Sequence, residues 1–124
     1  MKDGAVCTEL QPFIQKIKMV QRLTQRHGRE FGFLVCEGTP EVMLKGGNRR
    51  SINLGNCGSK ANILSVHSHP SGKAYPSIID VIVGANNNVR LSCIIGDSQV
   101  QCNEYHLDGN VITREPRCQF KLEK

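Results

Sequence analysis

The chain has 124 residues, enough for one domain with a single hydrophobic core and too few for two. Its 39% content of hydrophobic residues argues for a globular protein and against a disordered chain. The sequence shows neither a leader nor an apolar run near the roughly 18 residues of a membrane span, so we expect a soluble cytoplasmic protein. The net charge of +5 would suit nucleic acid, but the basic residues are dispersed and have almost no aromatic neighbours for base stacking, which argues against that partner.

The first predicted element is a helix within residues 8–28. Its apolar residues recur at intervals of three and four, the spacing of an amphipathic helix, and Gly28 is a natural stop. The start is open, because Thr8 and Gln11 resemble a capping box, whereas Pro12 fits best at the first helical position.

Short apolar runs follow the helix and predict strands. The apolar and aromatic run at 31–38 predicts a buried strand. Two further short strands are predicted around a Gly-Gly-Asn turn, at 41–47 and 49–55. Residues 61–69 predict another strand, which carries two histidines at its C-terminal end.

The rest of the chain predicts one short helix and three strands. The helix is predicted at 76–87, with a proline in its first turn, and the strands at 89–96, 98–106 and 110–116. Most connections are too short for crossover helices, so the sequence predicts one α/β domain with a largely antiparallel sheet.

Six cysteines are many for a cytosolic protein of this size. None forms a C-x-x-C pair, so a structural zinc knuckle is not predicted. Intracellular disulfides would be ordinary in a hyperthermophile and unusual in a mesophile. The disulfide pairing of the six cysteines stays open. Cys93 and Cys102 flank a predicted hairpin turn and could face each other across two strands. Cys36 is interpreted as a small buried hydrophobe.

The stretch LSVHSHPSGKAYPSIID contains the residues that indicate a metal site. A strand points residues two apart to the same face, so His67 and His69 are expected side by side with Ser68 turned away. On a helix that begins at Pro76, Ser77 and Asp80 share a face that a turn can bring towards the histidines.

Ligation by His67, His69 and Asp80 would leave the fourth position of a tetrahedral zinc ion open, the arrangement of a catalytic site. Zinc can bring the pKa of a bound water to about 7. Such a site needs a base and an oxyanion donor. Ser77 is the candidate donor, and the base is sought in Glu30 or Glu37, which flank the first predicted strand.

These residues carry a family resemblance. His67 and His69, then seven residues, then Ser77-Ile-Ile-Asp80 resemble the motif of the JAMM/MPN-plus zinc metalloproteases, including the prolines after the second histidine and before the serine. In that family a glutamate precedes an apolar strand upstream of the motif, and Glu30 stands in that place. The resemblance therefore makes Glu30 the expected base.

By this resemblance, residues 1–124 are a single JAMM/MPN-plus domain of a minimal prokaryotic, archaeal or viral type. The implied fold is α/β, with a curved, mostly antiparallel sheet flanked by an N-terminal helix and a short helix after the motif, related to the cytidine deaminase architecture. The implied reaction is zinc-dependent hydrolysis of peptide or isopeptide bonds, and the implied substrates are ubiquitin-like proteins or their conjugates. A homodimer through an exposed sheet edge could form as well.

Two other interpretations of the function stay open. The chain could be a non-catalytic MPN-type interaction module, although inactive family members generally lack some ligands and this chain keeps all of them. The segment His-Pro-Ser-Gly also resembles the RadC-like branch, which would suggest a protein associated with nucleic acid.

Each part of the motif has an ordinary interpretation when it is taken alone. Strand histidines are commonly inert, and Ser-x-x-Asp is an ordinary helix-start pattern. His27 more simply serves the helix dipole, His106 more simply faces solvent, and Tyr75 either covers the site or packs in its loop. The register of the whole motif, with two prolines and an upstream glutamate, favours the metal site.

Overall fold

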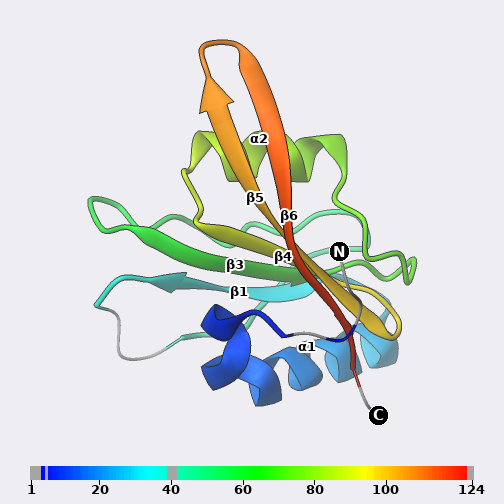
Figure 1. The fold of residues 1–124 in the computed structure, drawn as a ribbon. Helices are drawn as coiled ribbons and strands as arrows, with labels where there is room; N and C mark the ends of the chain where they lie inside the picture. Colours follow the sequence, from blue (N-terminus) through cyan, green and yellow to red (C-terminus); the bar gives the residue numbers. More distant parts are fainter. Residues whose placement is uncertain (1–3, 5, 39–41, 123–124) are drawn as a thin grey trace.

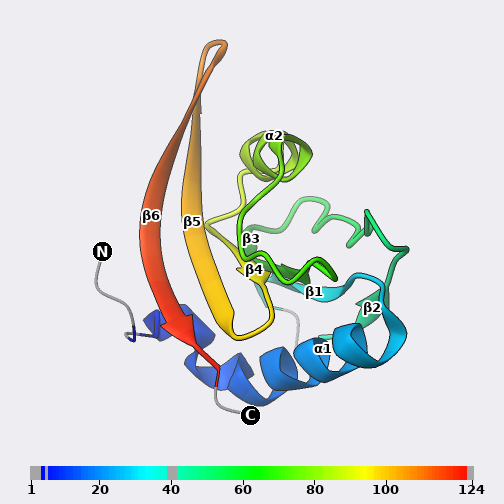
Figure 2. The same cartoon turned by 90° about the vertical axis from the view of Figure 1, so that its right-hand side faces the viewer.

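A computed structural model describes residues 4, 6–38 and 42–122 as one sheet with a helix against each face (Figure 1). The sheet has six strands in the order β2-β1-β3-β4-β5-β6. Figure 2 shows α1 below the sheet and α2 on its other side. The mixed α/β class and the mostly antiparallel sheet predicted from the sequence are confirmed.

Strand pairing brings the two halves of the chain together. Neighbouring strands are antiparallel except β3 and β4, which run parallel. The helix α2 (Ile78–Asn86) provides the crossover between these two strands, as a parallel pair requires. The strand bounds are β1 Phe31–Cys36, β2 Lys45–Gly46, β3 Asn62–Ser68, β4 Leu91–Ile95, β5 Gln99–Asp108 and β6 Val111–Lys121.

The N-terminal helix begins as a 3₁₀ turn. The 3₁₀ helix η1 (Thr8–Phe13) contains Pro12 and leads into α1 (Ile14–His27). No side-chain capping bond forms at the start of η1, so the expected Thr8 capping box is absent from this described segment. Gly28 ends α1 as predicted, in a left-handed conformation with φ of 66°.

The hydrophobic core lies between α1 and one face of the sheet. Buried apolar side chains of α1 pack against those of the central strands and of the C-terminal end of β6. They include Leu10, Ile17, Val20, Phe33, Leu64, Val66, Leu91, Ile95, Val100 and Phe120. The side chains on the other face of the sheet point towards α2, where the candidate site lies.

Two sequence predictions need correction. Residues 49–55 do not form a strand, because only Lys45 and Gly46 pair with β1. The second helix begins at Ile78 rather than at Pro76, with Ser77 as its N-cap. The start of the predicted 41–47 strand lies outside the described residues. Among the described residues, no helix is long and apolar enough to cross a membrane.

All six cysteines pair in disulfides. The pair Cys93–Cys102 links β4 to β5, as the predicted hairpin suggested. Cys7–Cys118 ties the N-terminal segment to β6, and Cys36–Cys57 ties β1 to the loop before β3. The interpretation of Cys36 as an unpaired buried hydrophobe was therefore wrong, because the 47–61 loop returns to the end of β1.

Candidate metal centre

The predicted ligands meet where β3 ends and α2 begins. The Nε2 atom of His67 lies 3.2 Å from Oδ1 of Asp80, and Nε2 of His69 lies 3.1 Å from Oδ2 of the same carboxylate. Glu30 joins the two histidines, since one ligand atom from each of the three residues lies within 4.8 Å of the others. The side chains that the motif predicted to converge are therefore close together.

The alternation of β3 sets the direction of the two imidazoles. His67 points towards α2, and its ring centroid lies 5.1 Å from that of His69. Ser68 points to the opposite face, where its hydroxyl contacts Thr24 of α1 and accepts a hydrogen bond from the backbone N–H of Phe31. The expected orientation of these three residues is confirmed.

Gly32 lets the neighbouring strand lie close behind His67. The two residues are register partners, and a Cβ on Gly32 would lie 2.2 Å from the carbonyl oxygen of Val66 and 2.9 Å from Cα of His67. A side chain at this position would separate β1 from β3. The glycine therefore keeps the strand that follows Glu30 beside the histidines.

The N-terminus of α2 fixes the carboxylate of Asp80. The hydroxyl of Ser77 accepts a hydrogen bond from the backbone N–H of Asp80 at 3.1 Å, and Oδ2 of Asp80 accepts one from the backbone N–H of Ser77 at 2.9 Å. This reciprocal capping box holds Asp80 at the third helical position. Ser77 and Asp80, which the motif predicted to act in one site, are thus also joined directly by the two hydrogen bonds of the helix cap.

Glu30 is held by its backbone immediately before β1. Its N–H donates to the carbonyl of Asn48 at 2.8 Å, and its carbonyl accepts from the N–H of Gly47 at 2.7 Å. The side chain is buried. Burial raises the pKa of Glu30 above its usual range, and this effect outweighs the opposing influence of His67 and His69. A carboxylate with a raised pKa is suited to accept and then release a proton.

The charges of Asp80 and His69 stabilise each other. Burial alone would raise the pKa of Asp80, but its interaction with the imidazoles of His67 and His69 outweighs burial and holds that pKa well below its usual range. Burial alone would lower the pKa of His69, but the hydrogen bond and charge of Asp80 raise it. The interaction therefore favours the charged forms of both side chains.

The nitrogen atoms that face Asp80 fit a metal ion. Nε2 of His67 is buried, and although it lies 3.2 Å from Oδ1 of Asp80 it makes no hydrogen bond of acceptable angle to any residue that the structure describes. Nδ1 of His69 lies 3.1 Å from the carbonyl oxygen of Lys73. Because a carbonyl only accepts, that nitrogen carries a proton, and Nε2, which faces Asp80, is the nitrogen that can bind a cation in place of a proton. Two imidazoles and a carboxylate are the donor set that zinc takes in open sites.

A cavity of about 320 Å³ extends from this cluster between the sheet and α2. Its floor includes Ser65 and Ser92, and one wall is the helix face with Ile79 and Val83. The opposite wall is an extended segment whose members Ser51, Ile52, Asn53, Leu54 and Gly55 all line the cavity. The cluster can therefore be approached by a molecule larger than water.

Sequence reasoning did not identify these lining residues. The sequence predicted a strand at 49–55, whereas Ile52 and Leu54 pair with no described strand and lie at the cavity wall with their neighbours. Ser65 and Ser92 are register partners on β3 and β4, which only the parallel pairing makes neighbours. No short motif signals either feature.

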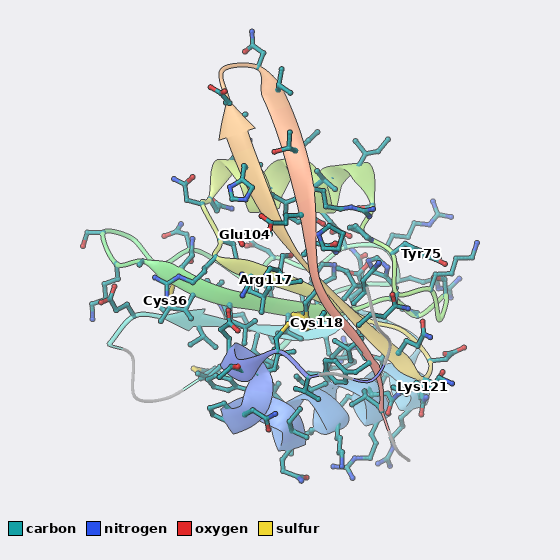
Figure 3. The ribbon with its side chains drawn as sticks, viewed as in Figure 1. Cys36, Tyr75, Glu104, Arg117, Cys118 and Lys121 are labelled. Atoms are coloured by element: carbon teal, nitrogen blue, oxygen red, sulfur yellow. A yellow bond between two sulfur atoms is a disulfide. The ribbon has the colours of Figure 1, made fainter. Side chains whose placement is uncertain are left out.

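The other candidates lie away from the cluster. Glu37 is exposed in the turn after β1, and the ring of His27 packs near Phe31 at 5.8 Å. His106 projects from β5 between Glu104 and Glu115, with its side chain 51% exposed. Tyr75 is exposed and lines a separate depression (Figure 3). Of the two glutamates considered as base, only Glu30 reaches the histidines.

Compared with known proteins, the sequence matches no protein-family model and no curated protein.

Proposed function

We propose that the protein is a zinc-dependent metallopeptidase of the JAMM/MPN-plus type that hydrolyses peptide or isopeptide bonds of ubiquitin-like conjugates. The observation that supports this most is the convergence of Glu30, His67, His69 and Asp80 from three separate segments at the end of one cavity. A non-catalytic interaction module has no need for a buried glutamate beside a complete ligand set. We also propose that the chain has the fold of that family, which the motif implies.

In this proposal His67, His69 and Asp80 hold the zinc ion. When bound, zinc supplies Lewis acidity that lowers the pKa of water to about 7 and polarises the scissile carbonyl. Lys73 orients His69 through its carbonyl, and the capping box orients Asp80. These supporting contacts fix the direction of the ligands, which strengthens a metal site.

Glu30 moves the proton. Its carboxylate takes a proton from the attacking water as the bond between water oxygen and carbonyl carbon forms. It then gives that proton to the leaving amine as the carbon–nitrogen bond breaks, so the carboxylate is regenerated. Its raised pKa and buried position support both steps, because the protonated form is stabilised between them.

Ser77 acts on the developing oxyanion. Its oxygen accepts the N–H of Asp80, which leaves the hydroxyl hydrogen free to donate. Its place at the N-terminus of α2 adds the positive end of the helix dipole. The substrate chain lies in the cavity, between the apolar side chains of α2 and the extended segment 51–55.

The test compares cleavage by Glu30→Gln and Asp80→Ala. Incubation of the zinc-loaded protein with ubiquitin-like conjugates should give cleavage that a chelator suppresses. Glu30→Gln should retain zinc and lose about 10²–10⁴-fold in rate, because it removes the base and no ligand. Asp80→Ala should lose both zinc and activity. Equal loss of zinc in the two variants would refute this division of roles.

A further inference from the structure

Four cysteines meet in the core between α1 and the sheet. Cys93, Cys102 and Cys118 are register partners across β4, β5 and β6, and Cys7 joins them from the segment before η1. The sulfur atoms of Cys7, Cys102 and Cys118 all lie within 4.8 Å of one another, and the sulfur of Cys93 is bonded to that of Cys102. Four separate segments thus bring their sulfurs to one place.

The third disulfide belongs to another part of the molecule. Cys36 and Cys57 connect the end of β1 to the loop before β3. Figure 3 shows Cys36 and Cys118 over different parts of the sheet. The pair Cys36–Cys57 therefore serves as an internal control for any property of the four-cysteine cluster.

Reduction would convert the cluster into four thiols. Each disulfide takes two electrons and two protons from a dithiol reductant, which is itself oxidised to a disulfide. We propose that in the reduced protein Cys7, Cys93, Cys102 and Cys118 bind a divalent metal ion that favours thiolate, such as Zn²⁺. Binding forms four metal–sulfur bonds and releases the four thiol protons.

The positions of the sulfurs support this site. In a tetrahedral site with zinc–sulfur bonds of about 2.3 Å, the sulfur atoms lie about 3.8 Å apart. The sulfurs of Cys7, Cys102 and Cys118 already lie within 4.8 Å of one another, and the sulfur of Cys93, bonded to Cys102 in the oxidised protein, has to turn towards them to complete the site. Burial makes neutral thiols inert, and a metal ion offsets this by displacing their protons.

The bound metal would replace the disulfides as a tie between the N-terminal segment and the sheet. Arg117 already supports this junction, since it pairs with Glu9 of η1 at 3.1 Å and with Glu104 of β5 at 2.9 Å. Cys7 and Cys118 are 111 residues apart and none of the four cysteines forms C-x-x-C, so no sequence motif reveals the cluster.

The test uses the full chain carrying His69→Ala, Cys36→Ser and Cys57→Ser, which removes the first metal centre and the separate cysteine pair. After anaerobic reduction by a dithiol and removal of the reductant, the protein is titrated with Co²⁺. Thiolate ligands give intense sulfur-to-cobalt charge-transfer absorption, which histidine and carboxylate ligands do not. We expect saturation at one cobalt per chain with these bands, and their loss on addition of Zn²⁺.

Cys102→Ser in the same background should weaken the bands by about a quarter or more and lower the affinity for cobalt, because it removes one of four thiolates and the one whose sulfur lies beside those of Cys7, Cys93 and Cys118. Saturation without sulfur bands, or bands and cobalt affinity left unchanged by Cys102→Ser, would overturn the proposal. If the reduced chain unfolds, circular dichroism during the same titration decides: refolding on metal addition supports the site, and a chain that stays unfolded at saturating metal refutes it. Because His69 is replaced, the result is independent of the proposed hydrolase.

Discussion

Single residues at the site perform two tasks at once. Ser77 caps α2 and is the proposed oxyanion donor, while Asp80 completes the cap and is a proposed ligand. Gly32 holds β1 close to β3 and so sets the distance between Glu30 and the histidines. A substitution at such a residue changes stability and function together, and the two effects have to be measured separately.

The variant Ser77→Ala separates the effect of the serine on stability from its effect on catalysis. Loss of the cap should lower the free energy of unfolding by about 0.5–2 kcal/mol. Loss of the hydroxyl donor should lower kcat by about 10²–10³-fold. Urea unfolding measures the first effect and steady-state kinetics of the folded protein measures the second. Ser77→Thr, which keeps the hydroxyl, should retain most of both. An unchanged kcat in Ser77→Ala would assign the serine to the cap alone.

Among the secondary-structure elements, α2 decides the shape of the site. It rests on β5 through Tyr105, whose ring lies 3.0 Å from where a Cβ on Gly84 would stand. The sequence predicted this helix and β3 well, because the motif, the prolines and the apolar runs all act locally. The sequence did not predict the role of residues 51–55, because a short segment with apolar residues can either pair with a strand or pack against a cavity.

The packing of α2 on Tyr105 can be measured by a titration. Burial raises the pKa of Tyr105 to about 12, with Arg114 opposing the shift and Asp80 adding to it. In the unfolded chain the value is about 10. Because the folded state favours the neutral phenol, its contribution to stability is present below pH about 10 and is lost as the pH rises through about 12.

The measurement is the phenolate absorbance of Tyr75→Phe, which leaves Tyr105 as the remaining tyrosine. The folded protein should titrate near pH 12 and the urea-unfolded protein near pH 10. A single midpoint near pH 10 in both states would show that α2 does not bury the phenol.

For the whole molecule, three disulfides tie segments of the chain together, and Cys7–Cys118 is the one that joins its two ends. Sequence reasoning anticipated Cys93–Cys102, since a hairpin brings neighbours in the chain together. It could not find Cys7–Cys118, which joins residues 111 positions apart, because the order of the strands decides which distant residues meet. Such pairs suit an oxidising compartment or a hyperthermophilic cytosol.

Removal of the long-range disulfide should cost more than removal of the local one. On a chain-entropy basis, a separation of 111 residues predicts about 4.8 kcal/mol and one of 21 residues about 3.3 kcal/mol. Urea unfolding of Cys7→Ala/Cys118→Ala and of Cys36→Ala/Cys57→Ala under oxidising conditions tests this order. An equal or larger loss in the second variant would contradict it.

The proposed hydrolysis depends above all on one zinc ion held by three side chains. Anomalous diffraction at the zinc absorption edge, from crystals of the oxidised protein grown with one equivalent of Zn²⁺, tests this directly. The predicted result is one peak about 2.0–2.2 Å from His67, His69 and Asp80, with Glu30 beyond bonding distance. A peak that excludes Asp80, or one in which Glu30 occupies the fourth position, would contradict the account.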